Sequence, residues 1–442
     1  MMKTLFGKAI SLLLAALTVL ALLAGCQTGS ETSPSATGVP PQETPTVSGT
    51  GETPAAPGRE NSSVRLADIQ SGWVWALSNG ESETPGDRLV AVSYAAPGDW
   101  ESRTLAVGSG GVFPVGYAGE KEADGRNGDY YLTFDGVPGP SWRVAEGSLP
   151  VGQDDYLLLP ASCQSGLLAF TPVKEDPAER AGFDNHGHPA ADPADVATME
   201  ALKKGRVVMH SELLATDADG GRVALFQFEN TDYGLLILAY LRGDLVIVRE
   251  FIGSVWADGV GWRADMEPDD AALFEVAMLC QTAEGLTIGF LWYGAEGVNR
   301  YLLAENGGHF TDFVSESWYY DRWEDSVQQT VYELSNAELW PELTAAALVG
   351  TWTGAWDTTD WASVAEDEDL ITFTFRPDGT GQAQWFGRAY PITYALDGNL
   401  LICKWVNDWS GEEAIPNTDV YRAKAERNRL TLDGYPVLAR AE

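Results

Sequence analysis

Aromatic and acidic side chains alternate in the segment 318–325, which reads Trp-Tyr-Tyr-Asp-Arg-Trp-Glu-Asp. Flat rings beside hydrogen-bond acceptors can hold a sugar, because the rings stack on its apolar face while the acceptors bind its hydroxyls. Cores and domain interfaces use the same rings heavily. A ligand surface and a packed core are therefore both open interpretations of this run. The candidate ligand-binding residues are Trp318, Tyr319, Trp323, Trp352 and Trp385.

A second chemical pattern is a group of carboxylates after Trp262, which includes Asp265 and Asp269. Two carboxyl groups about 5–9 Å apart serve as acid and base in glycoside hydrolases. The alternative interpretation is a solvated acidic turn. Apart from this pattern, the sequence contains no His-Glu-x-x-His, Gly-x-Ser-x-Gly, Ser-x-x-Lys or phosphate-binding loop motif. We therefore assign no catalytic residue and no cofactor.

Histidines are the third candidate, and the chain has only four. His186 and His188 stand two positions apart beside Asp184 and Asp192, and imidazole suits a divalent transition metal such as zinc or nickel. The same residues run into a predicted helix that Asp192 would cap, so both rings can simply be solvated in a polar loop. His186 and His188 are weak metal candidates, and we predict no metal site.

The N-terminus indicates where the protein resides. Lys3 and Lys8 precede the apolar stretch Ala9–Leu23, and Leu23-Ala24-Gly25-Cys26 follows. A basic start, a short apolar stretch and small residues are typical of a secretory signal. The cysteine after Ala-Gly resembles the lipobox of bacterial lipoproteins. This resemblance implies a signal peptide over residues 1–25 and a diacylated Cys26 that anchors the protein to the outer face of a cell membrane.

The residues after Cys26 predict a flexible tether. Between Gln27 and Ser63, 24 of the 37 residues are Ser, Thr, Pro or Gly, a composition that cannot bury enough apolar surface to fold. The whole chain has 28 basic and 64 acidic residues, a formal net charge of −36. Such a field repels phosphate backbones, so we expect no nucleic-acid partner. The predicted tether spans residues 26–63.

Short strand-like segments dominate from Val64 onward, bounded by Gly, Asp, Asn and Pro. We predict a mainly β protein whose region 64–345 is a sandwich or a sheet-repeat structure. Helices are expected only from Asp192, followed by Pro193, to about Lys204, and from Asn336 to Ala347. Cys163, Cys280 and Cys403 are too far apart in sequence for a metal knuckle. Cys163 and Cys280 can pair, or all three can be free.

The sequence pattern of the C-terminal region 346–442 predicts a small antiparallel barrel. Strand-like blocks with alternating faces, such as Ile371–Phe375 and Leu400–Trp405, are joined by Asp-Gly turns. The opening Gly350-Thr351-Trp352, the Phe-x-x-Asp-Gly-Thr hairpin and a closing Leu-x-Leu strand resemble the lipocalin-like domains of exported bacterial proteins. The resemblance implies a barrel whose mouth holds a small apolar molecule.

Two functions are consistent with these patterns. The first is a non-catalytic, membrane-anchored extracytoplasmic binding module for a small apolar ligand, a cell-wall glycan or an envelope partner. The alternative is an extracellular glycosidase-type hydrolase that acts on the cell envelope with carboxylates such as Asp265 and Asp269.

Overall fold

The structure is a computed structural model. It describes residues 62–80, 85–92, 99–122, 134–151, 155–173, 188–256, 259–261, 274–293, 297–319, 337–355, 370–385, 387–407, 415–433 and 436–441. The predicted signal peptide and Cys26 lie outside these residues. Among the described helices, none has the length and apolar character needed to span a membrane. The prediction of a mainly β protein is confirmed.

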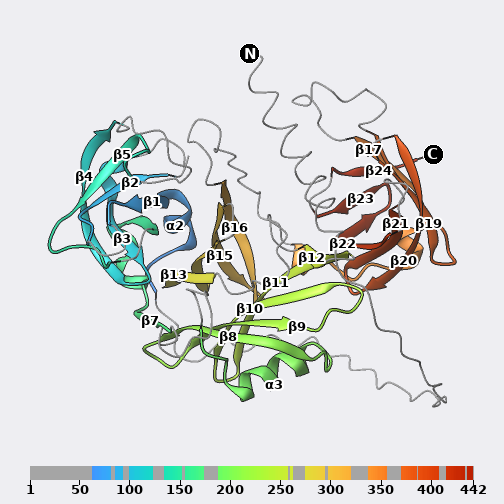
Figure 1. Cartoon of the computed structure of the whole chain (residues 1–442), viewed down its shortest axis with the longest axis horizontal. Helices are drawn as coiled ribbons and strands as arrows, with labels where there is room; N and C mark the ends of the chain where they lie inside the picture. Colours follow the sequence, from blue (N-terminus) through green and yellow to red (C-terminus); the bar gives the residue numbers. More distant parts are fainter. Residues whose placement is uncertain are drawn as a thin grey trace, which may run out of the picture. The chain divides into compact units, whose positions relative to one another are not determined.

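The first sheet closes into a six-stranded antiparallel barrel in the order β1-β2-β5-β4-β3-β6 (Figure 1). Its strands are β1 (Val74–Ser78), β2 (Arg88–Ala91), β3 (Arg103–Gly108), β4 (Gly111–Lys121), β5 (Gly139–Val144) and β6 (Asp155–Pro160). The short helix α2 (Leu66–Gly72) precedes the barrel, and the 3-10 helices η1 (Trp100–Ser102) and η2 (Ala161–Gly166) flank strands β3 and β6.

Strand β6 shows why this barrel does not stand alone. Tyr156 and Leu158 point into the barrel core, whereas Leu157 and Leu159 pack into a second core shared with strands of the next sheet. A strand buried on both faces is expected to be apolar throughout, and Tyr-Leu-Leu-Leu meets that requirement. The barrel is therefore attached to the rest of the protein by an apolar interface.

The central sheet consists of two sets of consecutive antiparallel strands. The two sets meet where β11 runs parallel to β16, with Val248 opposite His309. A backbone hydrogen bond of 2.9 Å from Leu168 to the Leu279 carbonyl brings the start of the sheet against β13, so the sheet curls around its own core. Its strands are β7 (Phe170–Pro172), β8 (Val208–Asp217), β9 (Arg222–Phe228), β10 (Gly234–Arg242), β11 (Leu245–Trp256), β12 (Gly259–Gly261), β13 (Phe274–Gln281), β14 (Leu286–Tyr293), β15 (Gly297–Asn306) and β16 (His309–Tyr319).

Helix α3 (Pro193–Leu202) covers the outer face of β9 and β10, and its Met199 lies in the core there. The Asp192 carboxylate accepts a 2.8 Å hydrogen bond from the Ala194 N–H, which confirms the predicted cap. The helix ends before the predicted Lys204, which adopts a φ of 55° and starts the turn.

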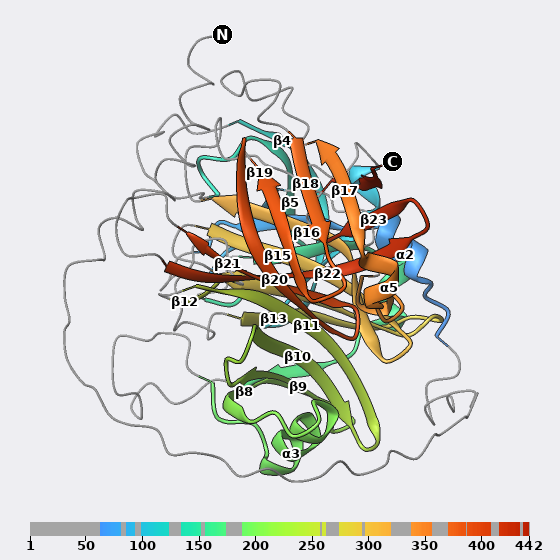
Figure 2. The same ribbon diagram turned by 90° about the vertical axis from the view of Figure 1, so that its right-hand side faces the viewer.

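The C-terminal strands β17 to β24 form the predicted antiparallel barrel, and β17 to β23 are labelled in Figure 2. The barrel closes where β17 pairs with β24. The strands are β17 (Gly350–Ala355), β18 (Leu370–Phe375), β19 (Thr380–Trp385), β20 (Arg388–Asp397), β21 (Leu400–Asn407), β22 (Ile415–Glu426), β23 (Arg429–Leu432) and β24 (Leu438–Arg440).

The predicted helix over Asn336–Ala347 is wrong. In its place are the 3-10 helix η4 (Ala337–Leu339) and the short helix α5 (Ala345–Leu348), with an irregular segment between them. Pro341 explains the break, because proline lacks a backbone N–H and its ring clashes with the preceding helical turn.

Strand β11 joins the central sheet to the C-terminal barrel. Its end pairs with β22 at Val255 and Thr418, and the Ser254 hydroxyl accepts a 3.3 Å hydrogen bond from the Val420 N–H. On the same strand, the Glu250 carboxylate forms ion pairs with Lys203, the residue directly after α3, and with Arg422 of β22. Burial is the largest single influence on the pKa of Glu250 and acts to raise it. The charges of Lys203 and Arg422 together outweigh burial, so the pKa of Glu250 is lowered.

Candidate functional site

The interior of the C-terminal barrel divides into a packed part and a polar end. Alternate residues of each strand face inward, and Trp352, Phe373 and Phe375 fill the interior almost without exposure to solvent. An eight-stranded barrel is just wide enough for side chains to fill it. The deep cavity that a lipocalin-like calyx would need is therefore occupied by this protein's own aromatic residues.

Trp352 closes one end of this barrel. Its indole N–H donates a 2.7 Å hydrogen bond to the Leu348 carbonyl, and the Arg440 guanidinium lies 4.3 Å from its ring centroid. Arg440 also donates to the carbonyls of Ala347 and Val349, at 2.9 and 3.0 Å. Trp352 is 0% exposed, so a ligand could reach its ring only if this end of the barrel opened.

The opposite end of the barrel presents an aromatic and acidic cluster. Trp405 lies two residues before the end of β21, half-buried, and its indole N–H donates a 2.6 Å hydrogen bond to the Asp419 carboxylate on β22. Tyr390 of β20 meets the Trp405 ring edge-on, with ring centroids 5.1 Å apart. The buried Asn417 stands directly opposite Trp405 in the strand register.

This arrangement can bind a ligand but shows no catalytic constellation. A half-buried indole offers an apolar surface for stacking, and a carboxylate beside it accepts hydrogen bonds from hydroxyl or amide groups. Asp419 also influences the barrel interior, since burial first and the Asp419 charge second raise the pKa of Cys403 above its usual range. We define Tyr390, Trp405, Asn417 and Asp419 as the barrel-end cluster.

The predicted ligand-binding residues come from two different sheets. Trp318 and Tyr319 end strand β16 of the central sheet, opposite Val298 and Gly297. Trp385 ends β19 and pairs with Arg388 at the end of the C-terminal barrel that carries the barrel-end cluster. Trp323 lies outside the described residues. The ligand roles of these residues stay predictions, and the structure brings only Trp385 to the same end of a barrel as Trp405.

A second aromatic cluster lies inside the central sheet. Tyr301 stacks on Phe290 at a centroid distance of 4.6 Å, and both rings contact Phe251. Arg249 packs over Phe251 and forms a 2.8 Å ion pair with Asp312. Burial raises the pKa of Asp312 in spite of the nearby Arg249 charge. Asp265 and Asp269, the predicted acid and base, lie outside the described residues.

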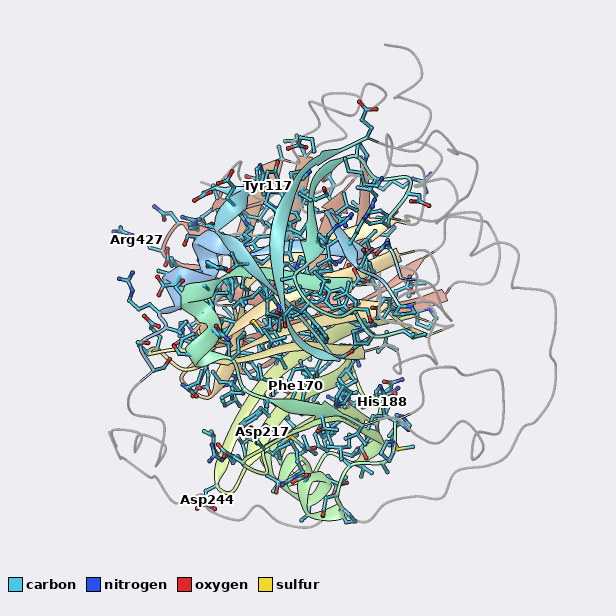
Figure 3. All side chains as sticks on the ribbon, turned by 90° about the vertical axis from the view of Figure 1, so that its left-hand side faces the viewer. Tyr117, Phe170, His188, Asp217, Asp244 and Arg427 are labelled. Carbon is cyan, nitrogen blue, oxygen red and sulfur yellow. The ribbon has the colours of Figure 1, made fainter. Side chains whose placement is uncertain are left out.

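The histidines are dispersed. Nδ1 of His188 lies 2.5 Å from the carbonyl of Val173, the residue directly after β7; His188 and Phe170 of β7 are both labelled in Figure 3. His186 lies outside the described residues. His210 of β8 forms a 2.7 Å hydrogen bond with the buried Glu212, which raises the pKa of His210 more than burial lowers it. Within the described part of the chain, no three His, Cys, Asp or Glu side chains form a metal-binding group.

Sequence reasoning missed the barrel-end cluster. Trp405 was recognisable only as part of a strand, and Asp419 is 14 positions further along the chain. Comparison with known proteins adds no assignment, because no family model, curated protein or solved structure matches the chain.

Proposed function

We propose that the protein is a lipid-anchored extracytoplasmic binding module whose ligand site is the barrel-end cluster. The observation that carries the binding role is the half-buried Trp405 indole held by Asp419 beside Tyr390. The sequence pattern before Cys26 supports the anchor, and the Ser/Thr/Pro/Gly-rich segment after it supports a body held away from the membrane.

The packed barrel interior narrows the ligand class. An apolar molecule enclosed in a deep calyx would have to displace Phe373 and Phe375, which are fully buried. A ligand that lies across the barrel end needs only a flat apolar face for Trp405 and hydrogen-bond donors for Asp419. A cell-wall saccharide meets both requirements, because a pyranose ring has an apolar face and a rim of hydroxyls.

The charge of the protein agrees with a neutral or cationic ligand. The chain carries a formal net charge of −36, which disfavours the approach of polyanions. Asp419 adds a local carboxylate at the barrel end. We therefore favour neutral glycan fragments over anionic polymers of the cell wall.

Thermal unfolding tests the binding proposal. The mature chain, beginning at residue 26 and carrying Cys26→Ser to keep it in solution, is melted with the neutral disaccharide of N-acetylglucosamine and separately with a fatty acid. A ligand at a hundredfold excess over its dissociation constant stabilises the native state by about 2.7 kcal/mol. A concentration-dependent rise with the saccharide supports the proposal. A rise only with the fatty acid contradicts the ligand class, and no rise with either contradicts the binding role.

The anchor is tested separately. With the signal peptide intact, Cys26→Ser removes the thiol that would carry the diacylglycerol, and we expect the protein to leave the membrane fraction on washing without detergent. The unchanged chain is the control. Retention of the variant in the membrane fraction would contradict lipid anchoring and leave the binding measurement unaffected.

A further inference from the structure

Two buried thiols lie on either side of the interface between the six-stranded barrel and the central sheet. Cys163 belongs to η2, directly after β6, and Cys280 is the penultimate residue of β13. Both are 0% exposed and lie in the same apolar core. In the structure both are free thiols, as is Cys403.

The backbone holds η2 against β13 at Cys280. Leu167, the residue after η2, forms an isolated β-bridge with Cys280. A Cβ placed on Gly166 would lie 3.0 Å from the Cys280 sulfur and 2.6 Å from the Gln281 carbonyl oxygen. No larger residue fits at position 166, so glycine permits the close approach of η2 to this strand.

Helical geometry brings Cys163 to the same face. A 3-10 helix has three residues per turn and rises about 2.0 Å per residue, so Cys163 lies one turn, about 6 Å, from Gly166 on the same side of η2. That side faces the Cys280 sulfur. Disulfide-bonded cysteines have Cα atoms about 4.4–6.8 Å apart, so a bridge requires η2 to hold Cys163 within this range of Cys280.

Burial determines when the two thiols can react. It raises the pKa of Cys163 to about 11 and that of Cys280 to about 12, the latter with a further contribution from the Cys163 charge. The thiolate is the reactive form, and both groups are protonated at neutral pH once the core has closed. Reaction must therefore precede complete burial, while the chain is folding.

We propose that Cys163 and Cys280 form a disulfide as the protein folds in an oxidising compartment. One cysteine thiolate attacks the disulfide of a thiol oxidant, such as a protein disulfide or oxidised glutathione, and releases one oxidant thiol. The other cysteine then attacks this mixed disulfide and releases the second oxidant thiol. The two cysteines lose two electrons and two protons, and the oxidant disulfide is reduced to two thiols.

The disulfide would fasten the six-stranded barrel to the central sheet. It closes a loop of more than 100 residues, a length for which the stabilisation from loop closure is large. Cys403 cannot replace either partner in the native fold, because it is buried in the separate core of the C-terminal barrel. It therefore serves as an internal control.

The test uses the mature chain with Cys26→Ser, unfolded and then refolded in a glutathione redox buffer or in dithiothreitol. Alkylation under denaturing conditions, followed by mass spectrometry, counts the free thiols. We expect one free thiol, Cys403, after oxidative refolding and three after reductive refolding. Peptide mapping should link Cys163 to Cys280, and the oxidised form should melt about 5–10 °C higher.

Alanine variants make the result specific, since free cysteine in a core behaves as a small apolar residue. Cys163→Ala and Cys280→Ala should each abolish the bridge and the shift in melting temperature, whereas Cys403→Ala should preserve both. Three free thiols after oxidative refolding of soluble, cooperatively melting protein would overturn the proposal. A bridge that includes Cys403 would overturn it as well. Neither outcome depends on ligand binding or lipid anchoring.

Discussion

The buried ion pair between Asp155 and Arg300 gives a quantitative prediction for the interface between the first barrel and the central sheet. Two guanidinium nitrogens of Arg300 donate to the same Asp155 oxygen at 2.5 and 3.0 Å, and the Tyr293 hydroxyl donates to the other oxygen at 3.3 Å. The side chains of Arg300 and Asp155 are only 1% and 6% exposed. Water therefore has little access to either charge, and the ion pair must compensate for the lost hydration.

Removal of one partner leaves the other charge buried at the interface without its nearest counterion. Such a change costs about 3–5 kcal/mol, and because 1.4 kcal/mol corresponds to a factor of ten, 4 kcal/mol lowers the folded-to-unfolded ratio by nearly a thousandfold at 25 °C. We expect Arg300→Met and Asp155→Leu to show this loss individually. The double variant should recover most of it, because replacing both charges by apolar groups is close to neutral.

Urea unfolding measures these free energies, and a second ion pair provides the matched control. Lys404 and Asp232 are also 2.5 Å apart, but their side chains are 48% and 52% exposed. Exposed pairs contribute about 0–1 kcal/mol, so Lys404→Met should be nearly neutral. Equal effects of Arg300→Met and Lys404→Met would refute the argument that burial determines the cost.

Three further changes test other parts of the structure. Arg440→Ala removes two hydrogen bonds and the contact with the Trp352 ring, and should destabilise the C-terminal barrel by about 2–3 kcal/mol in urea unfolding; a loss below 0.5 kcal/mol would contradict this. Hydrogen bonding to Glu212 raises the pKa of His210, so this pair stabilises the fold below the unfolded pKa near 6.5 and loses its effect as the pH rises through the folded pKa. His210→Gln should therefore lower the melting temperature at pH 5.5 and not at pH 8.5, and a pH-independent effect would be inconsistent. Val64→Asp introduces a charge into the apolar core that Val64 shares with Cys163 and Cys280, and should cost at least about 2 kcal/mol; a loss below about 0.5 kcal/mol would contradict this.

Much of the C-terminal barrel was predictable because its turns and strands point to the same structure. The Asp397-Gly398-Asn399 turn separates two alternating segments, and Gly398 adopts a φ of 61°, which glycine accommodates without strain. Local turn chemistry fixes the pairing of neighbouring strands. Strands β18 and β21 accordingly coincide with the predicted blocks Ile371–Phe375 and Leu400–Trp405 to within two residues.

The first barrel was harder to predict because β4 has weak strand character. Its sequence contains Pro114, Gly116 and Gly119, residues that strands normally disfavour. The register shifts between Tyr117 and Gly119, which disrupts the two-residue periodicity. Closure of this barrel depends on pairing between β1 and β6, and no local pattern encodes that contact.

The barrel-end cluster depends on register in the same way. Trp405 and Asp419 meet because Cys403 pairs with Asp419 and Trp405 with Asn417 across β21 and β22. A shift of one residue would turn Asp419 out of the barrel. The sequence shows the alternation of each strand but not the register between them, so it does not reveal that Trp405 and Asp419 meet.

The most direct test of the proposed function is the affinity of the mature chain for the neutral disaccharide of N-acetylglucosamine, measured by calorimetric titration. Trp405→Leu removes the stacking surface, and Asp419→Asn keeps the shape but removes the charge. Trp100→Leu is the matched control, because Trp100 is another half-buried indole, located in the first barrel. We predict saturable binding that both barrel-end variants weaken at least tenfold and that Trp100→Leu leaves unchanged. Absence of binding, or equal affinity in all four proteins, would contradict a ligand site at this end of the C-terminal barrel.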